Sequence, residues 1–236
     1  MMSEPPDRGR FAATPLPLWY RVPDGFHPID LDEDSEERLE QTAQALARVY
    51  PSATREQLVA TTLGFELTLA KAASAGVVFF SSFVLRTEED EPVAGICQLS
   101  VAERPPGDPN LYPLNVLEAA APPEQGVHQG IVELPGGPAA VTVAGHETSV
   151  PGVLFGVEGN VSSLVRTVTF QMAVPRSREA VTIFFATEDL EHDDEFLELA
   201  TVFAAGVSFT QPPKPPSEEE VAAAERIQGD VRATFG

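Results

Sequence analysis

The strongest constraint on the fold lies between Leu164 and Phe209, where the spacing of apolar residues changes partway along the segment. Apolar side chains alternate along Val168–Val174 and again along Val181–Phe185, and Pro175–Glu179 separates the two runs. A two-residue period with a reversal predicts a β-hairpin that buries one face in a core. The next segment repeats apolar residues at helical spacing and ends at a glycine, which predicts a helix (Phe196, Leu199, Ala200, Phe203 and Gly206).

Two further helices are predicted near the start of the chain, over Asp34–Tyr50 and Thr54–Ser74. Each begins with a capping box, in which the first residue is followed three positions later by a glutamate or glutamine. The apolar residues of the second helix cover more than one of its faces, so we expect this helix to be buried (Leu58, Val59, Leu63, Phe65, Leu67 and Leu69).

Short apolar runs separated by turn-forming residues predict strands along the rest of the chain. Two short strands are expected within Leu18–Leu31, and a short helix is expected over Leu111–Ala120. Further strands are predicted at Val77–Arg86, Val93–Val101, Val127–Leu134, Ala139–Val143, Val150–Val157 and Val207–Phe209. This order predicts an α+β fold, in which helices pack on a mostly antiparallel sheet of about six or seven strands.

The element order resembles the Mog1/PsbP-like fold over roughly Leu18 to Phe209. The resemblance is carried by the closing helix Phe196–Phe203 followed by Val207–Phe209, by the helix-to-strand junction Gly76–Phe79 and by the strand end Gln171–Pro175. The general character of the sequence is also similar to that of uncharacterised actinobacterial proteins. Members of this fold are mostly non-enzymatic accessory or assembly proteins, which is what the resemblance implies for function. It identifies no site residues.

Proline-rich segments divide the chain into three parts. Residues 1–17 are predicted to form a flexible arm, residues 18–210 a single α+β domain, and residues 211–236 a proline-rich linker followed by a terminal helix. Ser217 caps this helix, and its thin apolar stripe predicts an amphipathic surface that binds a partner protein or packs on its own domain (Val221, Ala224, Ile227 and Val231).

The charge balance limits the classes of partner. The chain has 36 acidic and 15 basic residues, for a formal net charge of −21. A surface this acidic repels phosphate backbones and anionic membranes, so neither nucleic acid nor a membrane is an expected partner. The excess charge serves either solubility or a cationic partner surface. With one cysteine and no visible signal peptide or membrane span, the expected location is cytoplasmic.

Two segments of the sequence are candidates for metal binding or nucleophilic catalysis. His192 lies in the acidic segment Asp189–Glu195, which suits either a divalent-cation site or a solvated helix N-terminus capped by Asp193 or Asp194; the second interpretation is favoured, because the glycine and distal glutamate of a calcium loop are missing. Cys97 suits a nucleophile or a small core residue, and the core is favoured. No catalytic residue, cofactor site or metal site is therefore predicted.

Arg176 and Arg178 form the tightest basic pair within the acidic domain. Arginine side chains bind carboxylates through paired hydrogen bonds, so this turn suits either a carboxylate-bearing partner or simple exposure to solvent.

These observations predict a non-enzymatic accessory or adaptor protein in a larger assembly, for example one for secretion or complex assembly. Its acidic surface and terminal helix would supply the protein–protein contacts. Two alternatives remain. One is a small-ligand-binding protein or enzyme with a pocket between sheet and helices, and the other is a structural subunit that self-associates.

Overall fold

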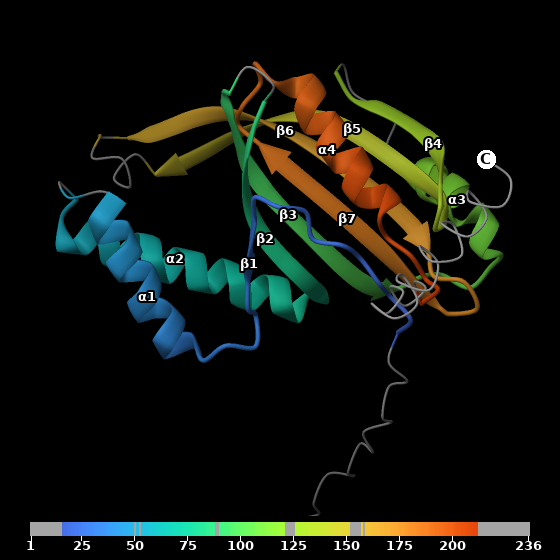
Figure 1. Ribbon diagram of the computed structural model, residues 1–236, viewed down its shortest axis with the longest axis horizontal. Coiled ribbons are helices and arrows are strands. Elements are labelled where there is room, and N and C mark those ends of the chain that lie inside the picture. Colours follow the sequence, from blue (N-terminus) through green and yellow to red (C-terminus); the bar gives the residue numbers. More distant parts are fainter. Residues whose placement is uncertain are drawn as a thin grey trace, which may run out of the picture. The chain divides into compact units, whose positions relative to one another are not determined.

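The computed structural model describes residues 16–49, 51, 53–87, 90–120, 126–151, 157 and 159–211 (Figure 1). Tyr20–Phe209 forms one unit of the chain. Of the second unit, which the two ends of the chain form, only residues 16–19 and 210–211 are described. The predicted terminal helix lies outside the described residues, together with the partner-binding positions assigned to it (Val221, Ala224, Ile227 and Val231).

The described strands form a seven-stranded sheet in the order β1-β2-β3-β7-β6-β5-β4. Every pairing in it is antiparallel. The α+β fold with an antiparallel sheet is therefore confirmed. The strands are β1 (Phe26–Ile29), β2 (Val77–Arg86), β3 (Pro92–Glu103), β4 (His128–Leu134), β5 (Gly137–Pro151), β6 (Asn160–Ala173) and β7 (Glu179–Thr187).

Helices pack on both faces of this sheet. In Figure 1, α4 crosses in front of the strands and α3 lies behind them. The alternation of side chains along β2 agrees with the presence of helices on both faces. Phe83 faces α4, whereas Phe80, three residues earlier, contacts α2 on the opposite face. The helices are α1 (Ser35–Val49), α2 (Arg55–Ser74), α3 (Tyr112–Ala119), preceded by a 3₁₀ turn at Pro109–Leu111, and α4 (Asp193–Ala205).

An aromatic cluster fills the core between α4 and the sheet. The Phe203 ring of α4 lies 5.5 Å from Phe185 and 5.8 Å from Phe26, measured between ring centroids. Phe83 packs over Gly95 of β3, where an added Cβ would lie 2.6 Å from the Phe83 ring. A glycine is therefore required at position 95, because any larger residue would displace the ring.

A β-bulge decides which residues of β2 are covered. The register shifts between Val77 and Phe79, so Val77 and Phe80 both pack against Leu69 of α2. Phe79 is buried on the other face, where its ring lies 6.0 Å from Phe203. Val78 occupies the bulge and is 51% exposed. The first half of β2 is therefore covered on both faces except at Val78.

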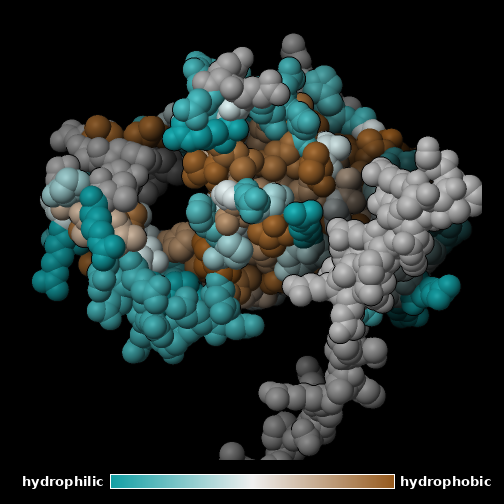
Figure 2. All heavy atoms as spheres, viewed as in Figure 1, coloured by the Kyte–Doolittle hydropathy of each residue, from teal (hydrophilic) through white to brown (hydrophobic). Residues whose placement is uncertain are grey.

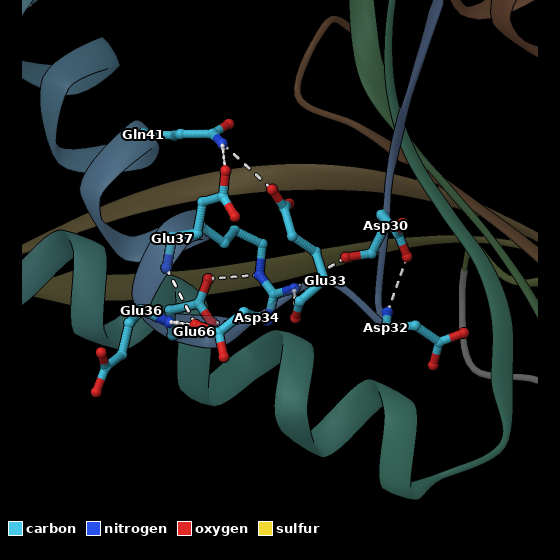
Figure 3. A network of polar contacts seen from close by, with 9 residues as sticks. Asp30, Asp32, Glu33, Asp34, Glu36, Glu37, Gln41 and Glu66 are labelled. Carbon is cyan, nitrogen blue, oxygen red and sulfur yellow. Dashed lines mark hydrogen bonds and ion pairs between the residues drawn. The ribbon is translucent and has the colours of Figure 1, made fainter.

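A buried ion pair joins the two early helices. Arg38 of α1 donates to Glu66 of α2 from Nε at 2.8 Å and from Nη2 at 2.9 Å, and both side chains are 10% exposed. Its Nη1 donates to the backbone carbonyls of Asp30 and Glu33, at 2.9 and 3.0 Å. One guanidinium therefore ties together both helices and the loop before α1, as Figure 3 shows around Glu66.

The starts of α1 and α2 agree with the sequence signals. Asp34 Oδ1 accepts the Glu36 N–H at the start of α1, and Thr54 and Gln57 form the complete capping box predicted for α2. Gly76 follows α2 with φ of +81°, a conformation that glycine adopts without strain.

Three predicted strands differ from the structure. Leu18–Val22 and Val207–Phe209 contain only single-residue bridges, at Trp19 and Ser208, so neither forms a strand. Both runs are too short to form a ladder of their own. The segment predicted as Val150–Val157 begins inside β5, which extends without a break from Gly137 to Pro151, while residues 152–156 lie outside the described part of the chain.

We predict that Glu66→Leu destabilises the fold by about 3–5 kcal/mol, because it leaves the buried Arg38 guanidinium without its carboxylate. The double variant Arg38→Met/Glu66→Leu is expected to lose less, since it removes both charges. Urea unfolding followed by circular dichroism measures the loss. Arg86→Met, which breaks an ion pair whose side chains are 66% and 80% exposed, is the control and should cost under about 1 kcal/mol. Equal losses in the Glu66 and Arg86 variants would contradict the interpretation.

Candidate functional site

An exposed apolar stripe runs along one side of α2. Val59, Leu63 and Leu67 follow one another at four-residue spacing and are 48%, 49% and 72% exposed. Residues at this spacing lie on one face of a helix. The expectation that α2 is buried is therefore wrong for this face. The sheet and α1 cover only the side that carries Thr62, Glu66 and Leu69, and the apolar residues of α2 extend beyond that side.

The neighbouring helix α1 and the loop before it are strongly acidic. Arg38 is the only basic residue between Asp30 and Glu40, and Glu66 already neutralises it. The carboxylates of this loop and of α1 accept hydrogen bonds from backbone N–H groups and from Gln41 (Figure 3). None of these hydrogen bonds comes from a cation. Figure 2 shows the surface over α1 as hydrophilic. The acids are Asp30, Asp32, Glu33, Asp34, Glu36, Glu37 and Glu40.

A second polar cluster surrounds His192 at the start of α4. Its Nδ1 lies 3.0 Å from both carboxylate oxygens of Asp189, and its Nε2 lies 2.8 Å from Glu91 Oε2. The hydrogen bonds to Asp189 and then to Glu91 raise the pKa of the imidazole, so its cationic form is favoured. His192 thereby connects the loop before α4 with the residue that precedes β3.

A second acid of this segment, Asp193, is also held by a cation. Arg166 of β6 donates to both carboxylate oxygens of Asp193, with Nε at 2.7 Å from Oδ1. These hydrogen bonds lower the pKa of Asp193. The predicted cap at Asp193 or Asp194 is wrong, because both lie inside α4, and His192 occupies the N-cap position and makes no capping hydrogen bond. Within the described ranges, no group of three His, Cys, Asp or Glu side chains could hold a metal ion.

An open groove of about 550 Å³ lies beside the His192 cluster. Its walls include Ala94 and Ile96 of β3, Val165 of β6 and Ala186 of β7, with Glu188 and Asp189 at one end. Ala186 follows Phe185, whose side chain points toward α4, so the Ala186 side chain points to the opposite face of the sheet. Ile96 pairs with Ala186 and faces the same way, away from α4. The helices on this face, α2 and α3, contact β2 and β4–β6, which leaves β3 and β7 partly uncovered.

Cys97 is a core residue, as predicted. It is 0% exposed, and burial raises the pKa of its thiol, which therefore stays protonated at neutral pH. Arg176 and Arg178 lie exposed in the turn between β6 and β7, where Arg176 has φ of +60°. A carboxylate-bearing partner at this turn stays a prediction.

Sequence reasoning singled out the segment Asp189–Glu195 but missed its distant partners Glu91 and Arg166, and it missed the groove. Glu91 and His192 are 101 residues apart, and Arg166 and Asp193 are 27 apart, so no local spacing connects them. The strand register would have placed Arg166 beside Thr187, close to the loop that holds Asp189, but that register is known only from the folded sheet.

We predict that the fold becomes less stable as pH rises from about 6 to about 9, in part because His192 loses its proton. A raised folded-state pKa gives stabilisation that is complete below the unfolded value of about 6.5 and is lost as pH rises through the folded-state pKa. In His192→Gln, the thermal midpoint measured by circular dichroism should fall less over this range. Exposed His146→Gln should behave like the unaltered protein. An identical pH dependence in His192→Gln would refute the assignment.

None of the helices in the described part of the chain has the length and hydrophobicity that a bilayer crossing requires. Comparisons with protein-family models, curated proteins and solved structures found no match. The resemblance to the Mog1/PsbP-like fold therefore stays a prediction, and a proposal of function depends on the surfaces described above.

Proposed function

We propose that this protein is a non-catalytic adaptor that binds a partner protein on α1 and α2. The observation that carries the proposal is the exposed apolar stripe of Val59, Leu63 and Leu67. The occupant is an amphipathic helix with apolar residues at matching spacing and with lysine or arginine on its flanks. Docking of an amphipathic helix through its apolar face is a common form of peptide recognition.

The apolar stripe supplies the affinity in this proposal. Single exposed hydrophobic residues are normal on protein surfaces, whereas contiguous ones mark interaction sites. Complete burial of one leucine or valine side chain is worth about 1.5–3 kcal/mol. Leu67, at 72% exposed, has most of this free energy still to gain, and Leu63, at 49% exposed, has about half of it.

The acidic residues of α1 and its preceding loop supply orientation and rate. Their charge is not neutralised by the described basic residues nearby, since Arg38 is buried against Glu66. A partner with basic flanks is attracted to such a surface, and its association becomes faster at low salt. The predicted terminal helix, Ser217 to Gly236, remains a second proposed contact element of the same adaptor.

We predict that a photo-crosslinking amino acid at Leu63 captures a partner from an extract of the source organism, and that the same group at Thr68 does not. Thr68 is exposed on a different side of α2, so it is a matched control. Leu67→Lys should abolish the crosslink, while Thr68→Lys, with the same change in charge, should retain it. High salt should weaken the crosslink. Mass spectrometry should place the captured segment in a basic amphipathic helix.

Three outcomes would overturn the adaptor proposal. Equal crosslinking at Leu63 and Thr68 would show that the stripe is not specific. A captured segment without basic flanks would remove the role of the acidic residues. Crosslinking of the chain to a second copy of itself, with a sedimentation coefficient that rises with concentration, would favour the self-associating subunit instead.

The groove on β3 and β7 favours a second candidate function, binding of a small apolar ligand. Its volume of about 550 Å³ is within the range of ligand pockets, and its walls are mainly apolar. The neutral dye Nile red is a suitable probe. We predict that Ala94→Trp, which fills the groove, reduces dye binding, while Ala102→Trp on the same face of β3 does not. Equal binding to both variants would exclude the groove as the dye site.

A further inference from the structure

A second buried arginine, Arg104, follows the end of β3. The residue is 8% exposed. Its Nη1 donates to the carbonyls of Gly107, at 3.0 Å, and Pro105, at 3.3 Å, and its Nη2 donates to the carbonyl of Ser177 at 2.9 Å. These contacts hold the guanidinium in place between the loop after β3 and the turn between β6 and β7.

The charge of Arg104 has no counterion in the described part of the chain. Its hydrogen bonds there are all to neutral carbonyls, and its buried Nε has no partner. Buried charges in proteins are normally paired, and an unsatisfied buried donor costs about 1–3 kcal/mol. An arginine that is both buried and unpaired indicates a site for an anion.

A pocket of about 180 Å³ lies against this side chain. Tyr112 and Asn115 add polar groups to its lining, and Val116 and Ala119 of α3 add an apolar wall. Burial raises the pKa of Tyr112 against the opposing effect of Arg104, so the hydroxyl stays protonated and is able to donate a hydrogen bond. The pocket therefore combines donors for an anion with a surface for a hydrocarbon group.

The surroundings of the pocket add positive charge within an otherwise acidic protein. The backbone N–H of Arg104 donates to the Arg178 carbonyl at 2.7 Å, so the turn that carries exposed Arg176 and Arg178 lies directly beside it. Two carboxylates near the pocket have other hydrogen-bond partners. Asp108, which also lines the pocket, accepts the Asn110 N–H at 2.9 Å, and Glu179 accepts from the Ser177 hydroxyl.

We propose that this pocket binds a carboxylate that carries a small apolar group. A single guanidinium suits the single charge and planar shape of a carboxylate, whereas a phosphate dianion requires more positive charge. The apolar wall of Val116 and Ala119 accommodates the hydrocarbon part. The carboxylate belongs either to a free small acid or to the C-terminus of a peptide, since both present the same chemistry. This site is separate from the proposed partner surface on α2.

The test titrates the ¹⁵N-labelled full chain with butanoate, and with a short peptide that ends in valine, while amide shifts are recorded by NMR. The expected result is a saturable shift at Gly107 and Asn115 with at least one of the two acids. A response to butanoate assigns the site to free acids, and a response to the peptide alone assigns it to a C-terminus. The neutral controls 1-butanol and the peptide amide, and also inorganic phosphate, should produce no saturation.

Two variants connect the shifts to the pocket. Ala119→Glu places a negative charge at the pocket wall and should weaken carboxylate binding about tenfold or more. Ala120→Glu adds the same charge at an exposed residue outside the lining and should leave the affinity unchanged. Tyr112→Phe, which retains the ring, should also weaken binding. The proposal is overturned if neither acid saturates, if 1-butanol or phosphate binds as well, or if Ala119→Glu and Ala120→Glu behave alike.

Discussion

The buried pair of Arg38 and Glu66 sets the position of the surface that we propose for partner binding. α1 packs chiefly on α2, and α2 reaches the sheet through Leu69 beside Val77 and Phe80. Arg38 also holds two carbonyls of the acidic loop, so its cation lies among carboxylates that would otherwise repel one another. Because replacement of one buried partner leaves an uncompensated charge, the pair fixes one arrangement of the helices and their acidic edge more firmly than exposed ion pairs could.

The two faces of the sheet are covered in different ways, and the candidate sites follow from that difference. On one face, Phe196 and Phe203 of α4 pack into a continuous aromatic cluster with β2 and β7. On the other face, α2 and α3 pack toward the two ends of the strand order, and neither covers the middle strands. The groove on β3 and β7 and the Arg104 pocket beside α3 both result from this incomplete cover.

Local signals in the sequence predicted the main helices and strands. The candidate sites depend on tertiary contacts that these signals do not show. The alternation around Phe170 and Ile183 predicted the hairpin of β6 and β7, and the capping residues Asp34 and Thr54 predicted the starts of α1 and α2. The exposure of Leu67 could not be predicted, because the apolar pattern of α2 does not show which side the sheet covers. The Arg104 pocket was equally hidden, since it depends on a turn 73 residues away.

The pairing of β3 with β7 has a consequence for synthesis of the chain. β1, β2 and β3 form one run of neighbouring strands, β4 to β7 form the other, and the ladder from Ile96–Ala186 to Glu103–Glu179 joins them. Until the ribosome has released β7, this edge of β3 has no partner, and Cys97 and Leu99, which are fully buried in the folded protein, lack their neighbours on β7. Unpaired edges of this kind recruit other strands. The nascent protein therefore passes through a long stage in which the edge of β3 is unpaired. Among the described elements, β7 and α4 emerge last, and β7 is the strand that pairs with this edge.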